Sequence, residues 1–287
     1  MSAIGGLADL DRYFSNHPLT RESPMSAWVR FAWWQIRSRL GREIVVDWVA
    51  GQRLAVHHGM KGATANIYVG LQEFADMMIP LHFLREGDLF FDIGANVGTF
   101  TVLASGACRA NTWAFEPDPG TACHLRRNIE LNKLDSLVKI HECALGKEQG
   151  EIGFTIGLDT VNRIASSSDE KVRMTRLEQL DALVGNAAPS MLKIDVEGAE
   201  EGVLQGGLAL LANPCLKVIE LETVTSESAN LLNINEFERA YYDPFRRRLD
   251  RTPNALKSSN SLFIRDWPFV QTRLETAKSV EIFGRKI

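Results

Sequence analysis

From Asp88 onward, short apolar runs alternate with segments in which apolar residues recur at helical spacing. An apolar run of four or five residues between turn residues is typical of a buried strand in a parallel sheet. Alternating strands and helices predict an α/β fold, with a mostly parallel sheet covered by helices on both faces. The expected strands are 89–93, 112–115, 138–142, 151–155, 191–194 and 217–221, with helices over 98–105, 118–132 and 199–210, and 260–265 and 279–283 as further strands at an antiparallel edge.

The first part of the chain follows a different pattern. Its expected elements, in order, are at most a short helix within 1–24, a helix over 25–40, a hairpin of strands 43–50 and 53–58, and a helix over 71–84. Gly41 is a natural end for the helix that precedes it. We therefore divide the chain into an N-terminal extension of a helix and a β-hairpin, residues 1–66, and a main α/β domain, residues 67–287.

Bulk composition narrows the class of protein further. The 287 residues are 45% hydrophobic and 24% charged, which is ordinary for a globular chain. A net charge of −4 gives no reason to expect a nucleic-acid partner. Four cysteines without C-x-x-C spacing predict neither a zinc site nor a disulfide framework. No apolar stretch predicts a transmembrane helix and no secretory signal precedes the domain, so the sequence predicts a cytoplasmic protein.

The most informative motif is the strand, turn and helix start over 89–99. Gly94 and Gly98 allow a sharp turn and are expected to leave room for a ligand against the backbone. Free N–H groups at such a turn suit a nucleotide-like cofactor. A dinucleotide site has G-x-G-x-x-G, whereas this chain has Asn96 in place of the middle glycine and Asp92 before the turn. A carboxylate there would repel a pyrophosphate, but it suits the ammonium group of S-adenosylmethionine.

A second carboxylate follows where a nucleoside would need it. Glu116 ends the next apolar run, 22 residues after Gly94, and either cofactor would present ribose hydroxyls at that point. The spacing therefore supports a nucleoside, and Asp92 with Asn96 favours the methyl donor. An NAD-linked enzyme remains the alternative for this part of the sequence.

Acidic residues gather at the ends of two later strands. Asp195 and Glu197 follow strand 191–194, and Glu222 follows strand 217–221. The carboxyl ends of strands in an open α/β sheet face the ligand crevice, so Asp195 is expected beside the cofactor. An alcohol acceptor needs a base, for which Asp195 is the first candidate and Glu197 the second, while Glu222 could reach the substrate. A divalent metal ion on these oxygens is possible, but it is not expected because no further ligand cluster is evident.

Two features outside these motifs leave alternatives open. His57 and His58 precede a glycine turn and could contact the substrate from a covering loop, although an ordinary strand end explains them more simply. The helix over 25–40 carries Trp28, Trp33 and Trp34 among arginines. Such a helix could pack on the main domain, contact a membrane surface or form a homodimer interface.

Taken together, five segments resemble one family of enzymes. They are Phe91–Gly98, Phe115–Pro117, Asn128 with Asn132, Ala144–Gly146 and Lys193–Glu200. In this order they are similar to the FkbM-type methyltransferases, over about residues 68–222. The resemblance implies a class I Rossmann-like fold, S-adenosylmethionine as cofactor, and O-methylation of a hydroxyl on a sugar, glycan or secondary metabolite. It also implies a cofactor site that comprises Asp92, Gly94, Ala95, Asn96, Gly98 and Thr99 at the methionine part, Glu116 at the ribose, Glu142 and Cys143 beside the adenine, and Asp195.

Other functions stay open at this point. An RNA methyltransferase would share the cofactor, but it needs a basic face with stacking aromatics, and the net acidity of the chain counts against it. A cofactor-free interaction module would have no use for Asp92, Glu116 and Asp195. The favoured partner is therefore a small-molecule or glycan acceptor.

Overall fold

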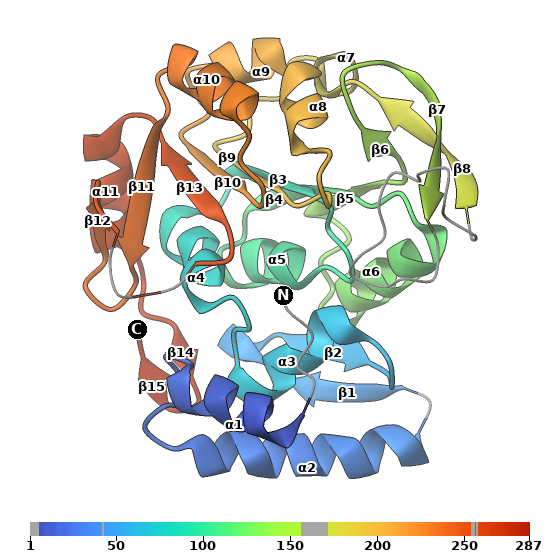
Figure 1. Ribbon diagram of the computed structural model, residues 1–287, viewed down its shortest axis with the longest axis vertical. Helices are drawn as coiled ribbons and strands as arrows, with labels where there is room; N and C mark the ends of the chain where they lie inside the picture. The colour runs from blue at the N-terminus through green and yellow to red at the C-terminus, as the bar shows by residue number, and fades with distance from the viewer. Residues whose placement is uncertain (1–5, 42, 156–171, 254–255, 257) are drawn as a thin grey trace.

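The computed structural model describes all residues except 1–5, 42, 156–171, 254–255 and 257. Its centre is an eight-stranded sheet (Figure 1), in which the strands from β10 to β5 are parallel and β13, β11 and β12 continue as an antiparallel edge. Across the sheet the order is β12 (Arg248–Asp250), β11 (Glu238–Asp243), β13 (Ser261–Ile264), β10 (Val218–Leu221), β9 (Met191–Ile194), β3 (Leu89–Ile93), β4 (Asn111–Phe115) and β5 (Val138–His141). The predicted α/β class with a mostly parallel sheet is confirmed.

Helices cover both faces of this sheet (Figure 1). On one face lie α4 (Phe74–Phe83), α5 (Thr99–Val102), the π-helical turn η2 (Leu103–Ala107), α6 (Pro119–Leu131) and α11 (Trp267–Glu275). On the other lie α7 (Leu180–Val184), α8 (Glu200–Gln205), α9 (Leu208–Ala212) and α10 (Ser226–Ile234). Phe90 packs with residues of α4 and α11 on one face, and Phe91 packs with residues of α7 to α10 on the other, because successive strand residues point to opposite faces.

The N-terminal extension forms its own small layer below the main sheet in Figure 1. It contains α1 (Leu7–Asn16), α2 (Pro24–Leu40), the antiparallel pair β1 (Ile44–Asp47) and β2 (Arg53–Val56) with the 3-10 turn η1 (Val49–Gly51) between them, and α3 (Lys61–Val69). The predicted hairpin and the helix over 25–40 are confirmed. Helix α3 was not predicted, and it crosses the domain boundary that we drew at residue 66. No helix in the described part of the chain has both the length and the apolar character to span a membrane.

A third, smaller sheet lies beside β5. It joins β6 (Ala144–Leu145), β8 (Val172–Glu178) and β7 (Gly150–Thr155), with β8 in the middle. Only the run over 151–155 was predicted as a strand. Strand β8 pairs with β7 along the whole length of β7. The pairing with β7 therefore determines where β8 forms more than the residue pattern of β8 itself.

Two predicted elements are wrong in detail. The helix expected over 199–210 is two helices, α8 and α9, separated by Gly206 and Gly207. A Cβ at Gly206 would lie 2.1 Å from the carbonyl oxygen of Gly146, so the chain approaches a neighbouring loop there at a distance that only glycine permits. The run 279–283 does not join the main sheet. Its strand β14 (Glu281–Ile282) pairs only with β15 (Arg285–Lys286) among the described residues.

Candidate active site

The turn after β3 lies where the strand order reverses, between β3 and β9. At such a switch point the connections leave the sheet in opposite directions and open a crevice at the carboxyl ends of the strands. Gly94 and Gly98 have φ angles of 78° and 89°, and Asn96 between them has a φ of 50°. The amides of Gly94 and Ala95 both donate to the carbonyl oxygen of Phe115, which ties the turn to the end of β4.

Each of the two glycines also has a packing role that the sequence did not predict. A Cβ at Gly94 would lie 1.8 Å from the carbonyl oxygen of Asp195, and a Cβ at Gly98 would lie 2.4 Å from Leu125. These positions therefore allow the loop after β9 and helix α6 to pack against the turn, and a role of the two glycines in ligand binding stays a prediction. Their positive φ angles also favour glycine, as the sequence predicted.

Asp92 is buried in β3, with 1% of its surface exposed. Its Oδ2 accepts a hydrogen bond from the Thr101 hydroxyl at 2.6 Å, while Oδ1 has no partner among the described residues. Burial raises the pKa of this carboxyl group, against the opposing effect of the nearby Lys193 ammonium. An unpartnered buried carboxylate oxygen is costly, so this group fits the vicinity of a positively charged ligand.

Glu116 fastens the turn from the end of β4. Its carboxylate accepts from the backbone N–H of Asn96 at 3.0 Å and from that of Asp118 at 2.9 Å. Burial raises the pKa of Glu116 to about 7, although these two amide donors act to lower it. A carboxylate can accept about four hydrogen bonds, so two acceptor positions remain for hydroxyl groups such as those of a ribose.

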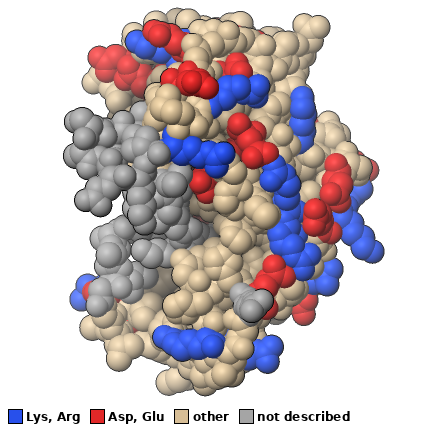
Figure 2. All heavy atoms as spheres, turned by 90° about the vertical axis from the view of Figure 1, so that its right-hand side faces the viewer, with Lys and Arg blue, Asp and Glu red and all other residues tan. Residues whose placement is uncertain are grey.

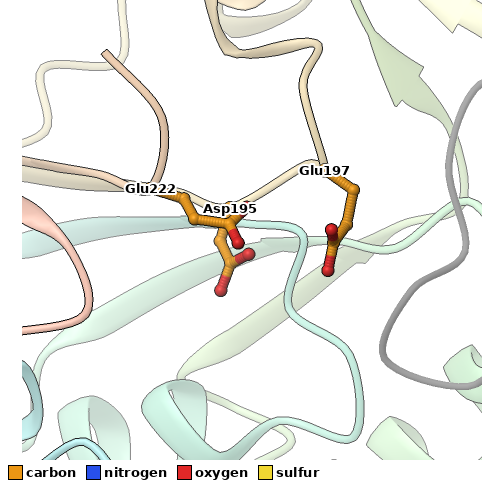
Figure 3. Close-up of side chains that lie close together, drawn as sticks. All are labelled: Asp195, Glu197 and Glu222. Carbon is orange, nitrogen blue, oxygen red and sulfur yellow. The ribbon is translucent and has the colours of Figure 1, made fainter. Parts of the chain in front are cut away.

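Asp195 and Glu222 form a carboxyl pair at the ends of β9 and β10. Figure 3 shows the two side chains directed toward the same point, with Glu197 descending beside them from the turn after β9. The Lys193 ammonium lies 2.7 Å from Asp195 Oδ2. Burial acts to raise the pKa of Asp195, but the ammonium outweighs it and holds that pKa below its ordinary value. Burial and the Asp195 carboxylate raise the pKa of Glu222 to about 8, so at neutral pH Glu222 is protonated and donates to Asp195.

Lys193 lies at the centre of this group, although the sequence analysis gave it no role. It stands opposite Asp92 of β3 and Glu220 of β10 in the strand register, so these three side chains share one face of the sheet. Its ammonium also lies 4.6 Å from the centre of the Phe100 ring. One signal could have identified Lys193 from the sequence. It is a lysine within an apolar run, with an acid two residues later and acids at comparable positions in the neighbouring strands.

The same carboxylates could also hold a cation. Asp195, Glu197 and Glu222 each offer an oxygen, and these atoms lie within 4.8 Å of one another. Oxygen ligands suit Mg²⁺, but Lys193 already supplies a positive charge to one of the three. Glu200 is not part of this group. It accepts from the backbone N–H groups of Val196 and Gly198 at 3.2 Å, which closes the turn as a local helix-start interaction.

A cavity of about 260 Å³ lies between α4, β10, β11 and β13, and its lining includes neither Asp195 nor Glu222. Glu220, which is 1% exposed, lines it, and neither of its carboxyl oxygens has a partner in the described structure. Asn260 also lines the cavity, and its Nδ2 is buried without an acceptor. Asp76 completes the polar wall, where it accepts from the Ser258 hydroxyl and the Ser259 amide. Glu220 precedes Glu222 by two residues on one strand, a separation of about 7 Å.

The remaining predicted site residues lie elsewhere. His57 Nε2 is 3.1 Å from His124 Nε2 of α6, and the backbone carbonyl oxygen of the exposed His58 accepts from His57 Nδ1 at 3.0 Å. Their described contacts therefore do not include Asp195, Glu197 or Glu222. Glu142 is exposed and pairs with Arg126, while Cys143 is 1% exposed within the core. Roles in substrate or adenine binding stay predictions for these four residues.

A comparison with known families now bears on this geometry. A model of the methyltransferase FkbM domain matches residues 92–245, which include the turn after β3, Asp195 and Glu222. The chain belongs to the FkbM methyltransferase family. The resemblance stated from the motifs is thereby confirmed.

Curated relatives match the same part of the chain. Hexuronic acid methyltransferase AglP of Haloferax volcanii is 27% identical over 140 residues, 48% of this chain and 57% of the relative. The 31-O-demethyl-FK506 methyltransferase FkbM of Streptomyces tacrolimicus is 29% identical over 159 residues, 43% of this chain and 60% of the relative. Methyltransferase 1 of Beauveria bassiana is 27% identical, over 48% of this chain and 66% of the relative. The matched region thus spans under two thirds of each relative.

Solved structures share the topology more loosely. A precorrin-6y C5,15-methyltransferase from Geobacter metallireducens has a TM-score of 0.40 at 14% identity, over 74% of this chain and 91% of its own. The tRNA (uracil-54, C5)-methyltransferase of Pyrococcus abyssi, solved with S-adenosyl-L-homocysteine, has a TM-score of 0.41 at 14% identity, over 78% of this chain and 43% of its own. Likeness at this level carries no argument about the reaction.

Proposed function

We propose that this FkbM-family chain is an S-adenosylmethionine-dependent methyltransferase that methylates a hydroxyl group on a sugar or another small hydroxylated acceptor. The carboxyl pair of Asp195 and Glu222 beside the cofactor turn carries the proposal. The names of two relatives support this class of acceptor. AglP is named for a hexuronic acid, and FkbM is named for an O-demethyl compound.

The residues around the turn fit the methyl donor. S-adenosylmethionine supplies a methyl group on a positively charged sulfonium and also carries an ammonium group. In the proposed site Asp92 offers its unpartnered oxygen to the positive end of the cofactor. Glu116 accepts the ribose hydroxyls with the lone pairs that Asn96 and Asp118 leave free. The first turn, including Ala95 and Thr99, forms the floor beneath the methionine part.

The carboxyl pair handles the proton of the acceptor. An alcohol becomes an effective nucleophile as its proton leaves, and a positioned base speeds that step. Asp195 is ionised because Lys193 stabilises its charge, so it accepts a hydrogen bond from the acceptor hydroxyl and orients the oxygen toward the methyl group. Glu222, with a pKa of about 8, becomes a second proton acceptor as the pH rises. Glu197 borders the same point and is the reserve candidate for the base.

We assign the acceptor to the cavity between α4, β10, β11 and β13. Among the described residues, the carboxyl group of Glu220 and the amide donor of Asn260 have no hydrogen-bond partner, and a ring hydroxyl can both donate and accept. The cavity volume of about 260 Å³ accommodates one sugar ring rather than an oligomer. Four free cysteines agree with the reducing cytoplasm that the sequence predicts as the location.

RNA is the weaker alternative for the acceptor. Figure 2 shows one face of the molecule on which a column of Lys and Arg is flanked by Asp and Glu, so this face has no basic track free of acidic neighbours. Phosphate backbones need such a track, because counterion release supplies most of the binding free energy.

The proposal is tested by mass spectrometry of methyl transfer. The protein is incubated with S-adenosylmethionine and a panel of uronic acids, neutral sugars, hydroxylated macrolides and RNA. We expect the mass gain of one methylene on a sugar or another small hydroxylated compound, and none with the Asp195→Asn variant. Methylation of RNA alone would overturn the acceptor class.

A further inference from the structure

Helix α2 has two apolar faces, and only one of them packs on the protein. Ala27 and Trp34 lie on the buried face of α2, and the helix contacts α3 on that side. Figure 1 shows α2 as the outermost element of the N-terminal layer, along the lower edge of the molecule. Its other face is therefore directed to solvent.

The solvent face carries a continuous apolar stripe. At about 100° per residue, its five large apolar side chains fall within an arc of about 80° along the length of the helix. They are Met25 (70% exposed), Val29 (63%), Trp33 (42%), Ile36 (63%) and Leu40 (80%). Thirteen large hydrophobic side chains are exposed in the described structure, and five of them lie on this one face. Contiguous exposed apolar surface of this kind marks an interaction site.

Charge decides what the stripe can contact. The 17 residues of α2 include Arg30, Arg37 and Arg39 and no acidic residue, although the whole chain has a net charge of −4. Arg37 and Arg39 lie on opposite sides of the stripe, each about 40° beyond its edge. Arg30 is engaged elsewhere, because it donates to the Tyr68 carbonyl oxygen and covers the Phe283 ring.

We propose that this face of α2 docks on the surface of an anionic lipid bilayer. An apolar stripe with arginines on both margins matches a helix that lies in the membrane interface, with its apolar side chains among the acyl chains and its guanidinium groups at the headgroups. A second copy of the chain fits less well. Two α2 helices face to face would bring Arg37 and Arg39 of each together, and neither helix has a carboxylate to pair with them.

Vesicle flotation tests this surface independently of methyl transfer. The full chain is mixed with vesicles of phosphatidylcholine alone or of phosphatidylcholine with phosphatidylglycerol. Wild-type protein floats with the anionic vesicles, and the bound fraction falls with added salt. Ile36→Glu weakens that binding about tenfold or more, because an apolar side chain no longer enters the lipid. Arg37→Glu combined with Arg39→Glu also weakens it and removes the preference for anionic lipid.

A matched control separates the stripe from general effects of charge. Ile234→Glu makes the same substitution at an isoleucine of similar exposure, 69% against 63%, on helix α10. This variant floats like the wild type if the proposal holds, and all variants keep the circular dichroism and cofactor affinity of the parent. Absence of flotation by the wild type, or equal loss in the Ile36 and Ile234 variants, overturns the proposal. So does a concentration-dependent dimer that Ile36→Glu dissociates while vesicle binding is absent.

Discussion

At the scale of single residues, Lys193 determines which carboxyl group of the Asp195–Glu222 pair carries a charge. Its ammonium, almost fully buried, lies 2.7 Å from Asp195 and shares a sheet face with Asp92 and Glu220. With Asp195 ionised, Glu222 retains its proton, since two adjacent carboxylates would repel each other. The sequence placed Asp195 and Glu222 at strand ends. It could not show that they share a proton, because that depends on their burial and on the contact between them in the folded protein.

Asp195→Asn is expected to separate catalysis from cofactor binding. The amide keeps the shape of the side chain but removes the base, so kcat falls by about 10² to 10⁴. Titration calorimetry should give a dissociation constant for S-adenosylhomocysteine within about threefold of the wild type, which is about 0.7 kcal/mol. A loss of cofactor affinity as large as the loss in kcat would contradict the assigned role.

The pH profile reports on Glu222. In the wild type, kcat should rise with pH through about 8, because Glu222 loses its proton there and becomes an acceptor. Glu222→Gln has no carboxyl group to ionise, so its profile should be flat across that interval. Stopped assays from pH 6 to 10 in buffers of constant ionic strength measure this. An unchanged inflection in the variant would assign it to another group.

Glu220→Leu should leave the protein equally or more stable, but it should weaken binding of the acceptor. Glu220 is buried with both carboxyl oxygens unpartnered, and replacing such a group by an apolar side chain of similar size is neutral or favourable. The melting temperature should therefore stay equal or rise, whereas KM for the methylated acceptor should increase about tenfold. An unchanged KM would remove the cavity from the acceptor site.

At the scale of elements, the pattern of apolar runs predicted every parallel strand of the main sheet, but it did not predict the close approaches between loops. Gly94 looked like a space for a ligand, yet the Asp195 carbonyl oxygen occupies the position of its missing side chain. Gly206 breaks a predicted helix because the chain passes close to Gly146. Both facts depend on a partner that is distant in sequence, so periodicity along the chain holds no information about them.

The start of α4 should make stability depend on pH. Burial raises the pKa of Glu73 from 4.5 to about 7, so the folded state holds this proton more tightly than the unfolded state. The resulting stabilisation is complete below about pH 4.5 and is lost as the pH rises to about 7, a difference of roughly 3 kcal/mol. Urea unfolding at several pH values should show that Glu73→Gln flattens this slope, whereas Glu86→Gln at an exposed position leaves it unchanged. Parallel slopes in all three proteins would exclude Glu73 as a source.

At the scale of the whole molecule, sheet topology explains why the sequence revealed the site as well as it did. Parallel strands present their carboxyl ends at one edge, so the acids near the ends of β3, β4, β9 and β10 had to gather there. The edge strands β11 and β12, helix α3 and the cavity that we propose for the acceptor lacked such a signal. They are built from segments that meet only after folding, as Asp76 and Asn260 do across more than 180 residues.

The central claim is that the turn after β3 binds S-adenosylmethionine. Titration calorimetry with S-adenosylhomocysteine and, separately, with NAD tests it most directly. We predict one site of micromolar affinity for S-adenosylhomocysteine, weakened at least tenfold by Glu116→Ala, and no heat of binding with NAD. Binding of NAD without any affinity for S-adenosylhomocysteine would contradict the account.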